Sequence, residues 1–154
     1  MNTIRFAILG LVASLEINPA TALQGWTDCH DSGTTVTSIS GFDTRTAKMV
    51  SEMTLPDATE LCHRDRSRAD GSPKGVSEAE CASNLMRDGV NQITVWANCE
   101  KATLTMEYSP ASGSKHVTHF KFPVFPDCGS DGAPAIAAFK TLCPSYEGKL
   151  ELDQ

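Results

Sequence analysis

The sequence predicts an α+β fold: a small antiparallel sheet of three to four strands, with about three helices packed mainly on one face and up to three disulfides. Three observations predict it. Residues 76–108 have the pattern of a capped helix followed by two alternating strands. Turns rich in Gly, Pro and Ser separate the other helix-like and strand-like stretches. Six cysteines, an even number, follow an apolar N-terminal segment.

The clearest elements lie in this central stretch. Ser77 and Glu80 have the spacing of a capping box, which predicts a helix over residues 78–88. Gly89 follows, and we expect it to end the helix in the left-handed conformation. Residues 92–99 and 103–108 then alternate between apolar and polar side chains, which predicts two strands joined by a turn.

The remaining elements are predicted from shorter patterns. Residues 34–40 are rich in Thr, Ser and β-branched side chains, which favours a strand. A stripe of Phe42, Thr46, Met49, Val50 and Met53 favours a helix over residues 42–53. We further expect a helix over 55–66, a strand over 115–125 that Pro123 interrupts, a helix over 134–142 and a frayed charged tail over 147–154.

The N-terminal residues 1–22 have the pattern of a cleaved signal peptide. An apolar run over residues 6–15 follows Arg5 and precedes the small-x-small sequence Ala20-Thr21-Ala22. The run is shorter than the roughly 20 residues that a membrane-spanning helix needs. We therefore expect cleavage after Ala22, a single domain over 23–154 in the bacterial periplasm or outside the cell, and no stable membrane anchor. The alternative is a buried N-terminal helix.

An exported chain with an even cysteine count predicts disulfides. The six cysteines are Cys29, Cys62, Cys81, Cys99, Cys128 and Cys143. Their neighbourhoods favour the pairs Cys128–Cys143, Cys62–Cys81 and Cys29–Cys99, although the sequence does not choose among the possible connectivities. Free buried thiols are the alternative.

The charge of the chain limits its partners. The 13 Lys and Arg residues against 19 Asp and Glu residues give a net charge of -6. Nucleic acid is excluded because binding it depends on neutralising phosphates with basic side chains. Acidity instead favours a basic protein partner.

The sequence offers no cofactor, metal or catalytic residues that we assign. His116 and His119 lie three apart on a predicted strand and therefore point to opposite faces. Disulfides would consume the cysteines beside His30 and His63. The letters of a triad occur in His30-Asp31-Ser32, but triads assemble from distant segments, and no G-x-S-x-G elbow or Gly-rich phosphate loop is present. The sequence therefore leans against an enzyme.

Binding surfaces are the remaining candidates. Alternation places Trp96 opposite Ile93 and Val95, so we expect it either to anchor an interface on an exposed sheet face or to lie in a two-sided core. The same alternatives apply to Phe120 and Phe122. A basic loop is the second candidate surface, and it contains Arg64, Arg66 and Arg68.

From these features we expect an inhibitor or immunity protein that binds a cell-wall hydrolase or a toxin. The alternatives are a small envelope hydrolase that uses carboxylates and a carrier of a small apolar ligand.

Overall fold

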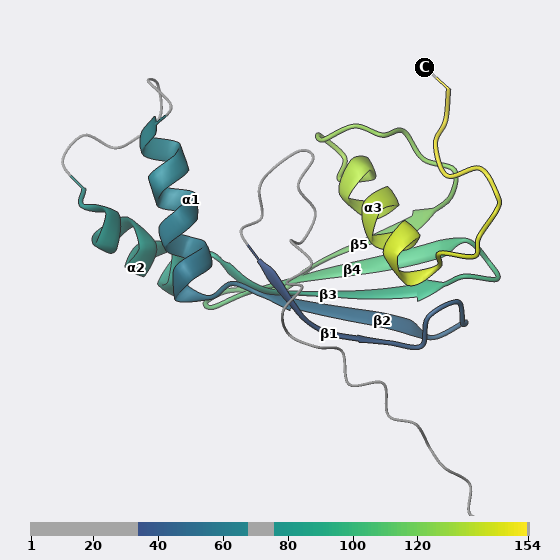
Figure 1. Ribbon diagram of the computed structural model, residues 1–154, viewed down its shortest axis with the longest axis horizontal. Helices are drawn as coiled ribbons and strands as arrows, with labels where there is room; N and C mark the ends of the chain where they lie inside the picture. The colour runs from purple at the N-terminus through teal and green to yellow at the C-terminus, as the bar shows by residue number, and fades with distance from the viewer. Residues whose placement is uncertain (1–33, 68–75, 154) are drawn as a thin grey trace, which may run out of the picture.

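The computed structural model describes residues 34–67 and 76–153 (Figure 1). Its elements are β1 (Thr35–Ser40), β2 (Ala47–Glu52), α1 (Leu55–Ser67), α2 (Glu78–Asp88), β3 (Val90–Asn98), β4 (Thr103–Pro110), β5 (His116–Lys121) and α3 (Gly132–Leu142). The five strands form one sheet in the order β1-β2-β3-β4-β5, and every neighbouring pair is antiparallel. The predicted α+β class is confirmed, but the sheet has five strands rather than three to four. The predicted signal peptide lies outside the described residues.

The additional strand is β2, where a helix was predicted over residues 42–53. Its buried side chains alternate strictly: Ala47, Met49 and Ser51 are at most 2% exposed, whereas Lys48 and Glu52 are exposed. Apolar residues four apart in sequence fit a helical stripe and also fall on one face of a strand, so this pattern does not distinguish a helix from a strand. In the strand conformation, the backbone N–H and C=O groups of β2 form hydrogen bonds with both β1 and β3, which favours a strand over a helix.

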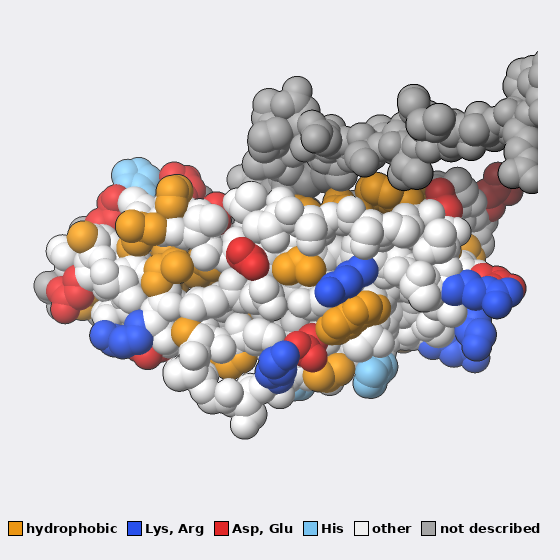
Figure 2. All heavy atoms as spheres, turned by 90° about the horizontal axis from the view of Figure 1, so that it is seen from below, with side chains coloured by type: hydrophobic (Ala, Val, Ile, Leu, Met, Phe, Trp, Pro, Cys, Tyr) orange, Lys and Arg blue, Asp and Glu red, His pale blue; other side chains and the backbone are white. Residues whose placement is uncertain are grey.

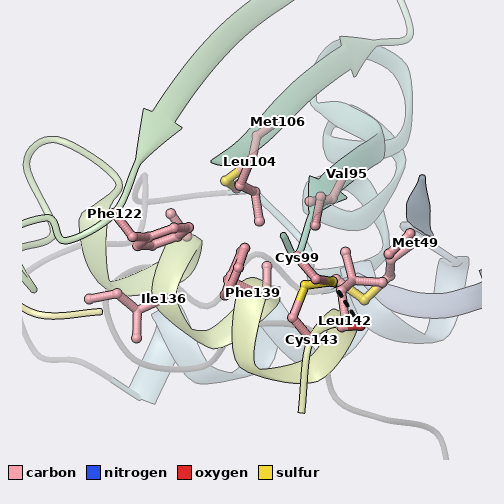
Figure 3. Packing of buried hydrophobic residues seen from close by; sticks show 14 of the residues in the cluster. Met49, Val95, Cys99, Leu104, Met106, Phe122, Ile136, Phe139, Leu142 and Cys143 are labelled. Carbon is pink, nitrogen blue, oxygen red and sulfur yellow. Dashed lines mark hydrogen bonds between the residues drawn. A yellow bond between two sulfur atoms is a disulfide. The ribbon is translucent and has the colours of Figure 1, made fainter. Parts of the chain in front are cut away.

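The main core lies between the sheet and α3. Val95, Leu104 and Met106 point from the inner face of the sheet toward Phe139 and Leu142 of α3, and all five are fully buried (Figure 3). Each such side chain contributes roughly 1.5–3 kcal/mol by leaving water. This one helix therefore closes the inner face of the sheet.

The hairpin formed by α1 and α2 does not lie on that face. Figure 1 places both helices beyond one end of the sheet, where they pack on each other. Their contact has its own small apolar cluster of Met53, Ala58, Cys62 and Ala82. The prediction that about three helices pack mainly on one face therefore holds only for α3. Only Met53 and Thr54 separate the end of β2 from the start of α1, so the helical hairpin begins where β2 ends.

The two predicted signals at the ends of α2 have different outcomes. Ser77 caps the helix as predicted, since its Oγ accepts a hydrogen bond from the Glu80 backbone N at 3.1 Å. Gly89 is not left-handed: its φ of -82° and ψ of 179° are extended. Glycine is favoured there because a Cβ would lie 2.5 Å from the Leu85 carbonyl oxygen.

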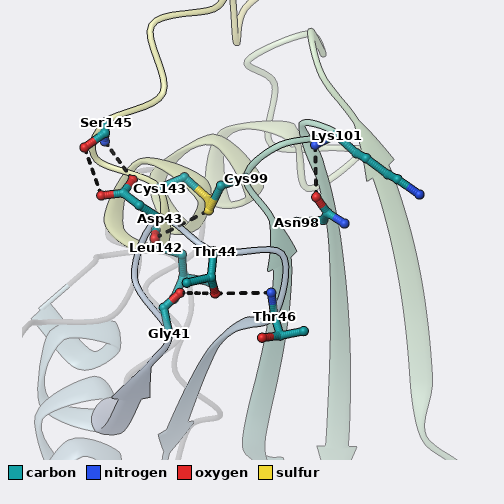
Figure 4. Close-up of a disulfide and its surroundings, with 10 residues drawn as sticks. All are labelled: Gly41, Asp43, Thr44, Thr46, Asn98, Cys99, Lys101, Leu142, Cys143 and Ser145. Carbon is teal, nitrogen blue, oxygen red and sulfur yellow. Dashed lines mark hydrogen bonds between the residues drawn. A yellow bond between two sulfur atoms is a disulfide. The ribbon is translucent and has the colours of Figure 1, made fainter.

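Two disulfides link the described residues. Cys62–Cys81, with Cα atoms 6.0 Å apart, joins α1 to α2 and confirms the predicted pair. Cys99–Cys143, with Cα atoms 5.4 Å apart, joins the end of β3 to the end of α3 (Figure 4). This bond shows that the predicted pairs Cys128–Cys143 and Cys29–Cys99 are wrong. The Cys128–Cys143 prediction rested on the short separation of these two residues in sequence. The helix α3 lies between them in the chain and crosses β2, β3 and β4, so it separates the two cysteines.

The same end of the molecule is fastened by the turn between β1 and β2. The Asp43 carboxylate accepts hydrogen bonds from the backbone N and the Oγ of Ser145, both at 2.9 Å (Figure 4). Asp43 N also donates to the Leu142 carbonyl oxygen at 3.0 Å. The turn thus holds the segment that follows α3.

The charged tail is ordered rather than frayed. Val124 N donates to the Leu150 carbonyl oxygen at 3.0 Å, and Leu152 N donates to the Val124 carbonyl oxygen at 2.9 Å. Leu150 also packs against the main core. The predicted strand over 115–125 is shorter than expected, because β5 ends at Lys121, before a cis Phe122–Pro123 bond.

Candidate binding surface

The face of the sheet opposite α3, which we call the outer face, is covered by none of the described helices (Figures 1 and 2). Strand register assigns its side chains. One row crosses the sheet through Ser40, Lys48, Trp96, Thr105 and His119, and the next through Ser38, Val50, Thr94, Glu107 and Val117. Figure 2 shows apolar side chains on this face interspersed with basic, acidic and His side chains.

Trp96 lies on the outer face of the middle strand β3, two residues before that strand ends at Asn98. Its side chain is 38% exposed. Lys48 on β2 holds its Nζ 5.7 Å from the centroid of the Trp96 ring, a cation–π contact of about 0.5–1 kcal/mol at an exposed site. On the other side, Thr105 Oγ1 lies 2.9 Å from His119 Nδ1. The sheet is therefore one-sided in its described part, and Trp96 does not belong to the core.

The second row of the outer face, through Thr94, Glu107 and Val117, contains both apolar and charged side chains. Val117 is 43% exposed, and Thr94 is buried. Lys115 Nζ donates to Glu107 Oε1 at 2.6 Å. This hydrogen bond lowers the pKa of Glu107, with a smaller contribution from the charge of Lys48, while desolvation opposes the shift. Glu107 is therefore a paired carboxylate at neutral pH.

The other predicted interface residues do not join Trp96. Phe120 pairs with Leu104 on the inner face and packs against the core. Phe122 is 6% exposed, with its ring centroid 4.5 Å from that of Phe139. Arg64 and Arg66 lie in α1, on the helical hairpin, and Arg68 lies outside the described residues. The outer face therefore keeps only Trp96 of the predicted set.

The residues that sequence reasoning missed are the neighbours of Trp96. The predicted helix over residues 42–53 contains Lys48, and a helix there does not place Lys48 beside Trp96, where β2 holds it. The alternation of Lys48, Val50 and Glu52 with buried residues was the signal that would have found it.

The candidate metal ligands of the sequence do not come together in the described part of the chain, and His63 instead lies with its Nδ1 3.3 Å from Glu78 Oε2. His116 pairs with Tyr108 on the inner face and His119 with Thr105 on the outer face, so the two histidines point apart. Among residues 34–67 and 76–153, no three His, Cys, Asp or Glu side chains lie together as a metal site. His30 and Ser32 lie outside these ranges.

Tyr108 lies on the inner face of β4, close to Asp131. Burial raises its pKa above the usual range, and the charge of Asp131 and a hydrogen bond with it act in the same direction. Asp131 is the residue before α3, so this contact ties β4 to the start of that helix.

A pocket of about 390 Å³ lies on the C-terminal segment, not between the sheet and α3. Tyr146 and Leu150 line it together with Lys140 and Lys149, and each lysine is paired with a carboxylate. A carrier of an apolar ligand would need a cavity in the core, and this pocket does not supply one.

Comparison with known proteins adds no relative: no protein-family model, no curated protein and no solved structure matches the chain. In the described ranges no helix has the length and apolarity to cross a membrane. The two disulfides there are typical of an oxidising compartment.

Proposed function

We propose that the chain is an exported protein-binding protein whose interface is the outer face, with Trp96 at its centre. The observation that carries the proposal is the 38% exposure of Trp96 on the middle strand of a sheet whose other face is closed by α3. Trp is among the side chains that contribute most to protein–protein binding, and such residues lie near the centre of an interface. Polar neighbours such as Thr105 and His119 suit the surrounding rim.

The size of the outer face fits this role. Five strands spaced about 4.8 Å apart, each about six residues long, make a plate of roughly 20 Å by 20 Å. With its side chains, such a plate presents a surface of the same order as the roughly 800 Å² that each partner contributes to a standard interface. Every strand in the face is hydrogen bonded to its neighbours.

The specific form of binding that we propose is inhibition: an inhibitor or immunity protein that blocks a cell-wall hydrolase or a toxin. The disulfides support an extracytoplasmic setting, and the outer face supports a protein partner. A hydrolase that uses carboxylates and a carrier of an apolar ligand are the alternatives, and no described feature favours either.

The experiment compares capture by three forms of the immobilised protein: wild type, Trp96→Ala and Leu55→Ala. Leu55 is a matched control because it is a large apolar side chain, 56% exposed, that lies on the helical hairpin and not on the outer face. Each form is exposed to envelope and culture-medium extract from the source cells.

We expect one stoichiometric protein to be retained by wild type and Leu55→Ala and lost with Trp96→Ala. The inhibitory form further requires that adding wild type lowers the activity of the captured protein and that adding Trp96→Ala does not. Equal retention by all three forms would contradict the outer face as the interface.

A further inference from the structure

We infer that the partner surface that docks on the outer face is acidic, with carboxylates that pair with lysines around Trp96. This inference rests on the proposed function, because it takes the outer face as the interface. It runs against the expectation of a basic partner, which came from the net charge of -6.

The lysines of the described ranges fall into two groups. Lys115, Lys140 and Lys149 are ion-paired, with Nζ–O distances of 2.6, 3.2 and 2.5 Å to Glu107, Glu151 and Asp153. Lys48, Lys101 and Lys121 are exposed, and no carboxylate of the described residues lies within ion-pair distance of them.

The three unpaired lysines lie at the same part of the sheet. Lys48 is directly beside Trp96 on β2. Lys121 on β5 is level with Asn98, two residues beyond Trp96, and Lys101 lies in the turn that follows Asn98. With strands about 4.8 Å apart, Lys48 and Lys121 stand roughly 15 Å from each other across the sheet. They therefore flank Trp96 on both sides.

Most acidic side chains of the described residues lie elsewhere; Glu100, which shares the turn with Lys101, is ion-paired with Arg45. The helical hairpin carries Asp57, Glu60, Glu78, Glu80 and Asp88, and the chain after β5 carries Asp127, Asp131, Glu147, Glu151 and Asp153. Two acids do lie on the outer face. Glu107 is paired with Lys115, and the charge of Lys48 also lowers its pKa; Glu52 accepts a hydrogen bond from Gln92 at 2.9 Å. The net charge of the whole molecule therefore does not describe the surface around Trp96.

A face with exposed lysines binds a partner of opposite charge more readily than one of like charge. A carboxylate-bearing partner would be steered toward the lysines, while Trp96 supplies the apolar contact at the centre. A basic partner would be steered instead toward the helical hairpin or the C-terminal segment. The lysines around Trp96 thus favour an acidic partner at the outer face and fix the part of the face to which its carboxylates bind.

The test uses two variants of equal net charge, Lys48→Glu/Lys121→Glu and Lys140→Glu/Lys149→Glu. The second pair is the control, because both of its lysines line the C-terminal pocket, away from the outer face. Binding to immobilised poly-L-glutamate, poly-L-lysine and a sulfated polysaccharide is measured at low and high salt. Circular dichroism checks that each variant folds.

We expect wild type to bind poly-L-glutamate at low salt and to be released by high salt. The control should bind at least threefold more tightly than Lys48→Glu/Lys121→Glu, since each exposed ion pair is worth up to about fivefold in affinity. Equal loss in both variants, binding to poly-L-lysine alone, or binding to the polysaccharide alone would overturn the inference, the last in favour of an anionic glycan.

The protein captured through Trp96 separates this inference from the proposed function. If Trp96→Ala abolishes its capture while Lys48→Glu/Lys121→Glu leaves it unchanged, the outer face remains the interface and the acidic partner is wrong. If capture does not depend on Trp96, the proposed function itself fails.

Discussion

Gly89 illustrates how one residue can be predicted for the wrong reason. It ends α2 as expected, but the position demands close approach and not a left-handed backbone, because a Cβ would lie 2.5 Å from the Leu85 carbonyl oxygen. We predict that Gly89→Ala lowers the free energy of unfolding by about 1–3 kcal/mol, since the helix end must shift. Urea unfolding measures this.

Gly129→Ala is the matched control for that measurement. A Cβ at Gly129 would have Asp127 Oδ1 at 3.7 Å as its nearest neighbour, an ordinary contact. The control should change the free energy of unfolding by no more than about 0.5 kcal/mol. Equal losses in the two variants would contradict the close-approach argument.

Asp127 gives a second prediction at this scale. Hydrogen bonds from the Ser130 backbone N at 2.7 Å and from the Ser130 Oγ lower the pKa of Asp127. The stability that this shift contributes is present above the usual carboxyl pKa and is lost as pH falls through the lowered pKa. Ser130→Ala should raise the pKa of Asp127 only part of the way, because the backbone bond remains. Carboxyl titration by NMR measures it, and an unchanged midpoint would refute the role of the hydroxyl.

Among the elements, the helical hairpin should behave as a separate unit of stability. Its apolar cluster is small, and Cys62–Cys81 closes a loop with a sequence separation of 19. Such a bond contributes about 3 kcal/mol in the chain-entropy estimate. We predict that Cys62→Ala/Cys81→Ala speeds hydrogen exchange in α1 and α2 while β3 and β4 keep their protection.

Cys99→Ala/Cys143→Ala is the corresponding control, because this bond fastens α3 to the main core. That variant should speed exchange across α3 and the sheet. If removing Cys62–Cys81 exposes the sheet equally, the hairpin and the sheet unfold together, and the separation into two units is wrong.

Elements with strong local signals were the ones that sequence predicted. The Ser77 cap and the alternation of β3 needed only neighbouring residues. In β2 the local pattern fitted two structures, and hydrogen bonds to strands on both sides decided between them. The alternation within β3 alone predicts that Trp96 faces away from Ile93 and Val95. Its neighbours Lys48 and His119 come from other strands, so only the pairing of the strands identifies them as neighbours of Trp96.

For the whole molecule, the net charge does not show where the charged side chains lie in the fold. The value of -6 is correct for the chain. Folding places most acids on the helical hairpin and after β5, and it leaves Lys48 and Lys121 unpaired around Trp96. Only the register of the sheet shows that separation, so the sign of the partner could not be obtained from composition.

A third disulfide is expected between two cysteines that the two observed bonds leave over. The two observed bonds use four of the six cysteines, and no described cysteine, Cys128 included, is free. Elimination leaves Cys29, which lies outside the described residues, as the partner of Cys128. Mass spectrometry of peptides from the non-reduced protein should therefore find Cys29 linked to Cys128 and should detect no free thiol. This bond would tie the N-terminal segment to the loop that precedes α3. Free thiols at both positions, or Cys29 linked to any other cysteine, would contradict the assignment.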